Sequence, residues 1–98
     1  MPARSFIAQL RCRPEARADL ICLQAELKRL VAEHEPDCLV YELFQSEADP
    51  DLFQVVATFR NEAAFEAHMH IDFHDRLVPP ILATLAEDMQ LAFYRSLA

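Results

Sequence analysis

Three of the four histidines of the chain fall within seven residues, at His68, His70 and His74. Histidine is the side chain whose ordinary pKa lies closest to neutrality, so it is a natural base for a phenol or an enol. Asp72 follows His68 by four residues, the spacing that places two side chains on one face of a helix. This pattern makes the cluster a candidate for general-base chemistry, in which Asp72 would orient the ring of His68. The alternative is a histidine with no chemical role.

The same segment contains a second spacing with a different chemistry. His70 and His74 are four residues apart, as in helical metal sites, but no HExxH motif and no clear third ligand accompanies them. The three cysteines lack CxxC spacing, and the chain has no glycine for a phosphate-binding loop. We therefore expect no metal and no other cofactor.

Aromatic residues recur in the segments that are predicted to surround this histidine cluster. A cavity lined by rings and a few polar groups suits a flat aromatic ligand. The alternative is that the rings only fill the core. The predicted ligand-binding residues are Tyr41, Phe59, Phe65, Phe73 and His74, and the hydroxyl of Tyr94 is a further candidate.

The elements that must position these residues follow from apolar periodicity and from turn-forming residues. Strands are expected at 5–12, 38–45, 52–59 and 89–95. Helices are expected at 14–34, from a cap at Asn61 to at least His70, and over 72–85, with an interruption or restart at Pro79-Pro80. The order β-α-β-β-α-β predicts an α+β, ferredoxin-like domain over residues 1–98.

The predicted strands carry apolar residues on both faces. Val40 and Phe44 lie on the opposite side of their strand from Tyr41 and Leu43, and Val56 opposes its two neighbours. The predicted helices cover only one face of a four-stranded sheet. We therefore expect a homodimer in which a second copy covers the other face.

Composition restricts the other partners. Nine basic and 16 acidic residues give the 98-residue chain a net charge of -7, which disfavours contact with nucleic acid. No apolar run approaches the roughly 20 residues of a membrane span, so no membrane partner is expected and a cytoplasmic location is predicted.

Three motifs together resemble one family. The segment 35–43, EPDCLVYEL, is similar to the E-P-G-C-L-x-Y-E-L signature of the antibiotic biosynthesis monooxygenase (ABM) family. Residues 49–53 resemble the D-P-x-x-F turn of that family, and 61–68, NEAAFEAH, resemble its S-E-E-A-L-E-A-H helix. Asp37 replaces the family's glycine, while Ala57 and Phe59 replace an acid and an indole of the third strand.

The resemblance implies a small α+β domain that pairs sheet to sheet into a dimeric α+β barrel. Members of the family include cofactor-free oxygenases of quinols and anthrone-like phenols. On this basis we predict a cofactor-independent monooxygenase that acts on such an aromatic molecule, with His68 as its base. Haem degradation, another activity in the family, is disfavoured because the chain has no Trp. The alternative is a non-catalytic dimeric domain that binds a small molecule or serves in a stress response.

Overall fold

Four strands and three α-helices account for most of the chain, of which the computed structural model describes residues 3–97. The strands are β1 (Arg4–Arg11), β2 (Cys38–Gln45), β3 (Leu52–Phe59) and β4 (Gln90–Arg95). The helices are α1 (Arg17–His34), which follows the 3-10 turn η1 (Pro14–Ala16), α2 (Glu62–His70) and α3 (Asp72–Leu82). Each predicted strand differs from the observed one by no more than one residue at either end.

The strands form one antiparallel sheet in the order β2-β3-β1-β4. The two central strands, β1 and β3, are joined in sequence through α1 and β2, so the sheet has the predicted ferredoxin-like topology. Phe6 of β1 lies opposite Ala57 of β3 and Phe93 of β4, which places these three residues on one face. The predicted fold class is confirmed.

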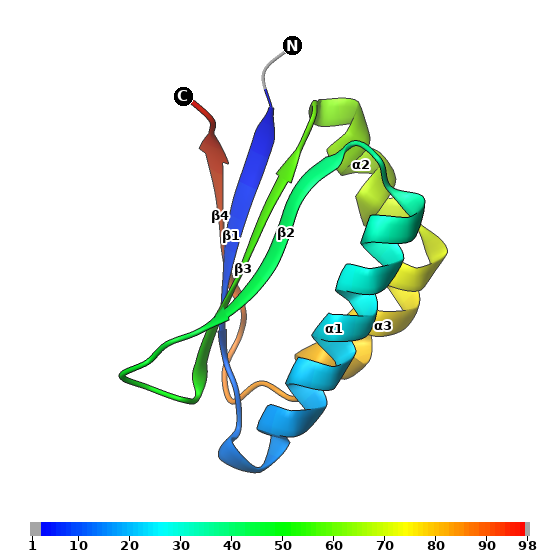
Figure 1. The fold of residues 1–98 in the computed structure, drawn as a ribbon. Coiled ribbons are helices and arrows are strands. Elements are labelled where there is room, and N and C mark those ends of the chain that lie inside the picture. Colours follow the sequence, from blue (N-terminus) through cyan, green and yellow to red (C-terminus); the bar gives the residue numbers. More distant parts are fainter. Residues whose placement is uncertain (1–2, 98) are drawn as a thin grey trace.

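All three helices pack against that same face (Figure 1). In α1 the buried residues are Leu20, Gln24, Leu27 and Val31, which recur every three or four residues and form one stripe. Leu23 and Leu30 are partly buried beside this stripe. The helix layer and the inner sheet face together enclose the core.

Helix α2 starts and ends at clear local signals. Asn61 caps its first turn, where Oδ1 accepts a hydrogen bond from the backbone nitrogen of Ala64 at 2.9 Å. Ile71 has extended backbone angles (φ -74°, ψ 144°), so α2 ends at His70 and α3 begins a new direction at Asp72. His68 and Asp72 therefore do not share one helix, contrary to the prediction.

The prediction that Pro79-Pro80 interrupts the next helix is wrong, because α3 continues to Leu82 with both prolines inside it. Both prolines are exposed, so the carbonyl groups that lose a backbone partner are on the side of the helix that faces water. Phe73, Leu77 and Ile81 are buried at four-residue intervals and hold the opposite side to the core.

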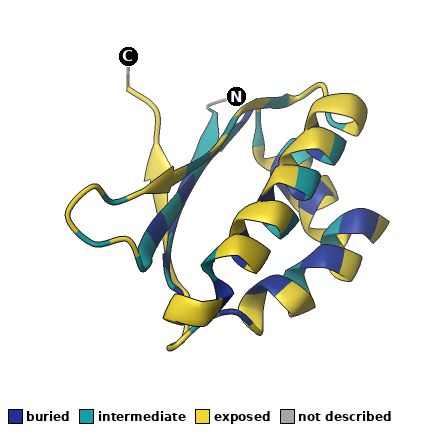
Figure 2. Cartoon of the chain, turned by 60° about the horizontal axis from the view of Figure 1, so that its bottom comes forward, coloured by how far each residue is buried: buried dark blue, intermediate teal, exposed yellow. Residues whose placement is uncertain are grey.

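No helix of the described residues 3–97 lies over the other face of the sheet (Figure 1). Val40, Phe44 and Tyr94 on this face are 41%, 55% and 54% exposed. Figure 2 shows that β4 is exposed along its whole length. Within residues 3–97, no helix combines the length and the apolar character that crossing a bilayer requires.

Candidate functional site

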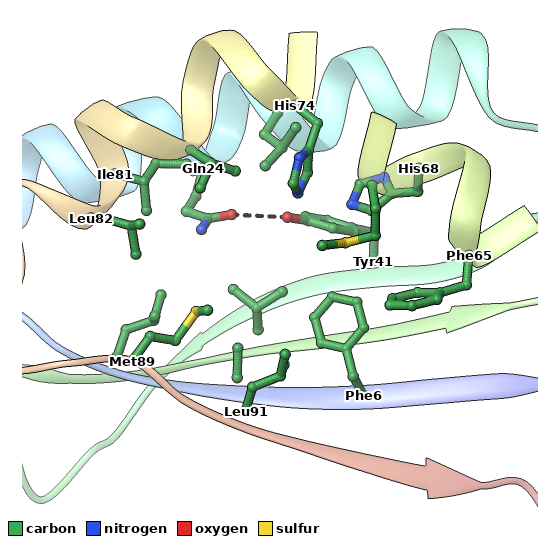
Figure 3. A pocket seen from close by; sticks show the side chains of 16 residues that line it. Phe6, Gln24, Tyr41, Phe65, His68, His74, Ile81, Leu82, Met89 and Leu91 are labelled. Atoms are coloured by element: carbon green, nitrogen blue, oxygen red, sulfur yellow. Dashed lines mark hydrogen bonds between the residues drawn. The ribbon is translucent and has the colours of Figure 1, made fainter. Parts of the chain in front are cut away.

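A cavity of about 140 Å³ lies between the helices and the inner face of the sheet. The strands supply its floor and the helices its roof (Figure 3). Most of the lining is apolar and includes Phe6, Leu10, Leu27, Val55, Phe65 and Ile81. Leu82, Met89 and Leu91, which also line it, are 43%, 38% and 43% exposed, so the cavity reaches the surface beside β4.

Four polar side chains enter this apolar cavity, and they come from four different elements. They are Gln24 of α1, Tyr41 of β2, His68 of α2 and His74 of α3. Figure 3 shows them close together, with the rings of His68 and His74 beside each other. An apolar pocket with a small set of converging polar groups is the usual form of a small-molecule site.

His68 is the most completely buried of these four, with 1% of its surface exposed. Its Nδ1 atom lies 3.0 Å from both carboxylate oxygens of Glu35, the residue that follows α1. An ionised carboxylate only accepts hydrogen bonds, so this contact assigns the ring hydrogen to Nδ1. In the neutral ring, Nε2 then keeps its lone pair, and Figure 3 shows a ring nitrogen turned toward His74 and the cavity.

Aromatic rings hold the imidazole of His68 in place. The ring of Phe59 is 4.9 Å from it, that of Tyr41 is 6.2 Å away and that of His74 is 4.6 Å away, measured between centroids. Phe59 is fully buried at the end of β3. It does not line the cavity itself but packs against the histidine that does.

His74 lies beside His68 at the start of α3. Burial, with a smaller contribution from the neighbouring His68, lowers the pKa of His74 from 6.5 to about 4. His74 is therefore uncharged at neutral pH. Its Nδ1 atom is buried and has no hydrogen-bond partner among the described residues.

Tyr41 and Gln24 form the other polar contact of the cavity. The Tyr41 hydroxyl donates a hydrogen bond to Oε1 of Gln24 at 3.2 Å. Burial, with smaller contributions from the neighbouring Cys38 and Glu35, raises the pKa of Tyr41 above its ordinary value of 10. The hydroxyl is therefore a neutral donor throughout the physiological range.

The structure brings most of the predicted site residues together but not all of them. Tyr41, Phe65, His68 and His74 line the cavity, and Phe59 supports it from behind His68. Phe73 is buried between α1 and α3, where its ring is 5.9 Å from that of His34, and it does not line this cavity.

Asp72 does not have the predicted contact with His68. Its carboxylate accepts a hydrogen bond from the backbone nitrogen of Phe73 at 2.7 Å, and Glu35 occupies the position at Nδ1 instead. The extended residue Ile71 separates the two helices, so the four-residue spacing does not correspond to one helical turn here.

Two other candidates lie away from the cavity. His70 is exposed, whereas His74 faces the cavity, and no three His, Cys, Asp or Glu side chains gather as a metal site within residues 3–97. Tyr94 pairs with Ser5 in the sheet register, which places it on the face opposite to Phe6 and Phe93. It therefore cannot supply a hydroxyl to this cavity.

Two polar residues of the site were absent from the sequence prediction. Gln24 interrupts the apolar stripe of α1 between Leu20 and Leu27, and a polar residue at such a position is a usable signal. Glu35 opens the EPDC segment, but its contact with His68 joins residues 33 positions apart. No local spacing indicates such a pair.

Comparison with solved structures finds the same fold. A protein described as a putative antibiotic biosynthesis monooxygenase from Caulobacter crescentus CB15 superimposes with a TM-score of 0.94 at 21% identity, over 99% of this chain and 92% of that one. A conserved protein from Methanosarcina mazei Go1 gives a TM-score of 0.91 at 20% identity, over 97% and 93% of the two chains. A search of curated proteins finds no match.

Closer similarity in sequence comes from a further structure and from a family model. An antibiotic biosynthesis monooxygenase of known crystal structure is 30% identical to this chain, with a TM-score of 0.87, over 97% of this chain and 99% of that one. The model of the family Antibiotic biosynthesis monooxygenase (ABM) matches residues 5–78, a stretch that begins within β1, ends within α3 and includes Glu35, His68 and His74. This chain belongs to the antibiotic biosynthesis monooxygenase family.

Proposed function

We propose that this protein is a cofactor-independent monooxygenase of a quinol-type aromatic molecule, with His68 as the general base. One observation carries the proposal: His68 lines an apolar cavity with Nδ1 held by Glu35, which leaves Nε2 free to accept a proton. The family to which the chain belongs supports the reaction class.

The chemistry needs only a base, a dry cavity and O₂. Removal of a proton from a quinol or an anthrone-like methylene gives an anion with electron density on carbon, which adds O₂ to form a peroxide anion on that carbon. The proton that His68 took returns to the outer oxygen and gives a hydroperoxide. Loss of water, with the remaining hydrogen of that carbon, leaves a carbonyl group, so the balance is CH₂ + O₂ → C=O + H₂O at a methylene and quinol + O₂ → hydroxyquinone + H₂O at a ring carbon. Oxygen is reduced and the carbon is oxidised.

The size of the cavity favours a substrate with one ring. Its volume of about 140 Å³ is close to that of the roughly 150 Å³ apolar cavity that accommodates a single benzene ring. An anthrone, with three fused rings, would have to extend past the exposed side chains of Leu82, Met89 and Leu91. We therefore favour a monocyclic quinol among the family's substrates.

The polar groups of the cavity suit a hydroxyl-bearing neutral molecule. His74 and Tyr41 are uncharged at neutral pH, so neither would attract an ion into the cavity. The Tyr41–Gln24 pair offers a hydrogen-bonding position for a hydroxyl group. A quinol bound between this pair and His68 would place one hydroxyl near His68.

Oxygen consumption tests the proposal. The wild-type protein, freed of metal, is supplied with a series of reduced monocyclic quinols and with anthrone. We expect uptake of one O₂ per quinol oxidised, and His68→Ala should lower turnover by about 10²–10⁴-fold, the usual range for loss of a general base. His68→Asn, which can still donate to Glu35 but cannot accept a proton, should be equally slow.

The matched control is His70→Ala, because His70 is a histidine of the same helix that is exposed and does not line the cavity. It should leave turnover within twofold of the wild type. Wild-type turnover in both His68 variants, on a quinol that the parent oxidises, would show that the assignment of the base is wrong.

A binding domain without catalysis is the second candidate. Ala57 and Phe59, both fully buried, stand where the family commonly has an acid and an indole, so these two groups are missing from the inner face. Saturable binding of a monocyclic quinol without any O₂ uptake would favour this function over the oxygenase.

We also propose that the functional unit is a homodimer. The bare outer face carries Ile7, Val40, Phe44, Val56 and Tyr94, which a second copy would cover. Sedimentation should give a mass of twice the 11.3 kDa of the chain. A folded species of 11.3 kDa at micromolar concentration would contradict the homodimer.

A further inference from the structure

We propose that Glu35 is a positioning residue: its carboxylate fixes the His68 ring so that Nε2 is presented to the cavity, and it favours the imidazolium that forms when Nε2 takes a proton. The inference rests on the proposed role of His68 as the base. It assigns a function to a residue that does not line the cavity of His68 and His74 and that the histidine spacing does not indicate.

The contact is symmetrical and shielded from water. Both oxygens of Glu35 are 3.0 Å from Nδ1 of His68, and the two side chains are 9% and 1% exposed. A charge-assisted hydrogen bond at a site that excludes water is stronger than its equivalent on the surface. Rotation of the imidazole by half a turn would break it, so the carboxylate selects one ring orientation.

The backbone of Glu35 is itself fixed on both sides. Its N–H donates to the carbonyl of Val31 at 2.9 Å, where α1 ends, and its carbonyl accepts from the backbone nitrogen of Cys38 at 3.0 Å, where β2 begins. Pro36 follows directly and restricts the backbone further. The carboxylate therefore reaches His68 from a rigid junction between a helix and a strand.

Among the titratable groups around His68, Glu35 supplies the carboxylate that is in hydrogen-bond contact with the ring. From β2, Tyr41 is neutral, and burial followed by the charge of Glu35 raises the pKa of Cys38 to about 11, so this thiol is neutral too. From α3, His74 is neutral. Asp75 of α3 and His70 of α2 are exposed and act on His74 in opposite directions.

The same loop contains a second carboxylate, that of Asp37, which does not contact His68. Asp37 lies two residues after Glu35 but is exposed, where it forms an ion pair with Arg60 at 2.9 Å. Exposed pairs of this kind contribute little to stability. Asp37 is therefore a matched control for Glu35, with the same charge and the same loop but no contact with the imidazole.

The proton transfer that this arrangement supports is simple. The O–H or C–H bond of the substrate breaks, an N–H bond forms at Nε2, and the positive charge of the imidazolium lies next to the carboxylate. Glu35 remains ionised and takes no proton. Nε2 later gives its proton to the oxygen that leaves as water, so neither side chain is changed at the end of the cycle.

The test compares Glu35→Gln with Asp37→Asn. In the ligand-free protein, the ¹⁵N chemical shifts of the His68 ring should show the hydrogen on Nδ1 in the wild type and in Asp37→Asn. In Glu35→Gln, whose amide can also donate, they should show a mixture of tautomers. With a quinol that the wild type oxidises, Glu35→Gln should lower kcat by roughly ten- to hundredfold with KM within twofold. The acid side of its pH–rate profile should move to lower pH.

A variant that retains the charge separates positioning from folding. Glu35→Asp keeps a carboxylate that is one methylene shorter, and it should keep the hydrogen on Nδ1 while showing a smaller loss in kcat. An Nδ1-protonated ring and wild-type kcat in folded Glu35→Gln would overturn the role of Glu35. Absence of O₂ uptake by the wild type would overturn the oxygenase itself, and the ring-nitrogen shifts would still decide whether Glu35 holds His68.

Discussion

The inner and outer faces of the sheet carry apolar side chains from the same strands but have different surroundings. On the inner face Phe53, Ala57 and Phe59 are at most 1% exposed beneath the helices. On the outer face Phe44 and Tyr94 are more than half exposed. Because side chains alternate along a strand, neighbours in the sequence are divided between these two environments.

This difference shows that the protonation of polar side chains in this fold depends on which face of the sheet the helices cover. His74 and Tyr41 acquire shifted pKa values because burial penalises their charged forms. Tyr94 bears the same hydroxyl group as Tyr41, but it lies half-exposed on the outer face. In the single chain, therefore, the helices keep the polar groups of the inner face drier than Tyr94 on the outer face.

The largest expected effect comes from comparing one phenylalanine on each face. Phe59→Ala should lower the free energy of unfolding by about 3–5 kcal/mol, because a fully buried ring that packs on His68 leaves a cavity. Phe44→Ala should cost less than about 1 kcal/mol, because that ring is 55% exposed. Urea unfolding at a protein concentration too low for self-association measures both. Equal losses would break the distinction between the faces.

The next prediction tests whether a second copy covers the outer face. Val56→Asp places a carboxylate in the middle of that face, on the central strand β3, opposite Ile7 of β1. Burying an unpaired charge is costly, so the variant should weaken dimerisation by about 100-fold or more in sedimentation. Ile21→Asp, an equivalent change at an exposed position of α1, is the control. Equal association by both variants would place the dimer contact elsewhere.

The smallest effect tests whether the inner face keeps His74 uncharged. The pKa of His74 is about 4 in the folded chain, and in the unfolded chain it has the ordinary value of 6.5. Between these two pH values the unfolded chain therefore binds more protons than the folded chain. Stability should therefore fall as the pH is lowered from about 6.5 to about 4, by about 1–3 kcal/mol from this group. His74→Asn should show a shallower fall in urea unfolding across that window. Identical slopes would mean that His74 titrates normally.

Much of the fold could be predicted because its signals are local. Alternation and β-branched residues defined 38–45 and 52–59 to the residue, and Asn61 marked the start of α2. The prediction at Pro79-Pro80 was wrong because tertiary packing of α3 outweighed the loss of backbone hydrogen bonds on its exposed side. The rule that proline breaks a helix considers neighbouring residues only and does not include the energy of that packing.

The sequence by itself determined the elements, their order and the presence of a histidine in the cavity, since propensity, capping and apolar period act over a few residues. Only the tertiary structure decided which group holds that histidine. Asp72 was near in sequence, but the extended Ile71 turns α3 away, whereas Glu35 comes from 33 positions earlier at the junction of α1 and β2. Contacts at such separation arise from how layers pack, and no spacing along one element encodes them.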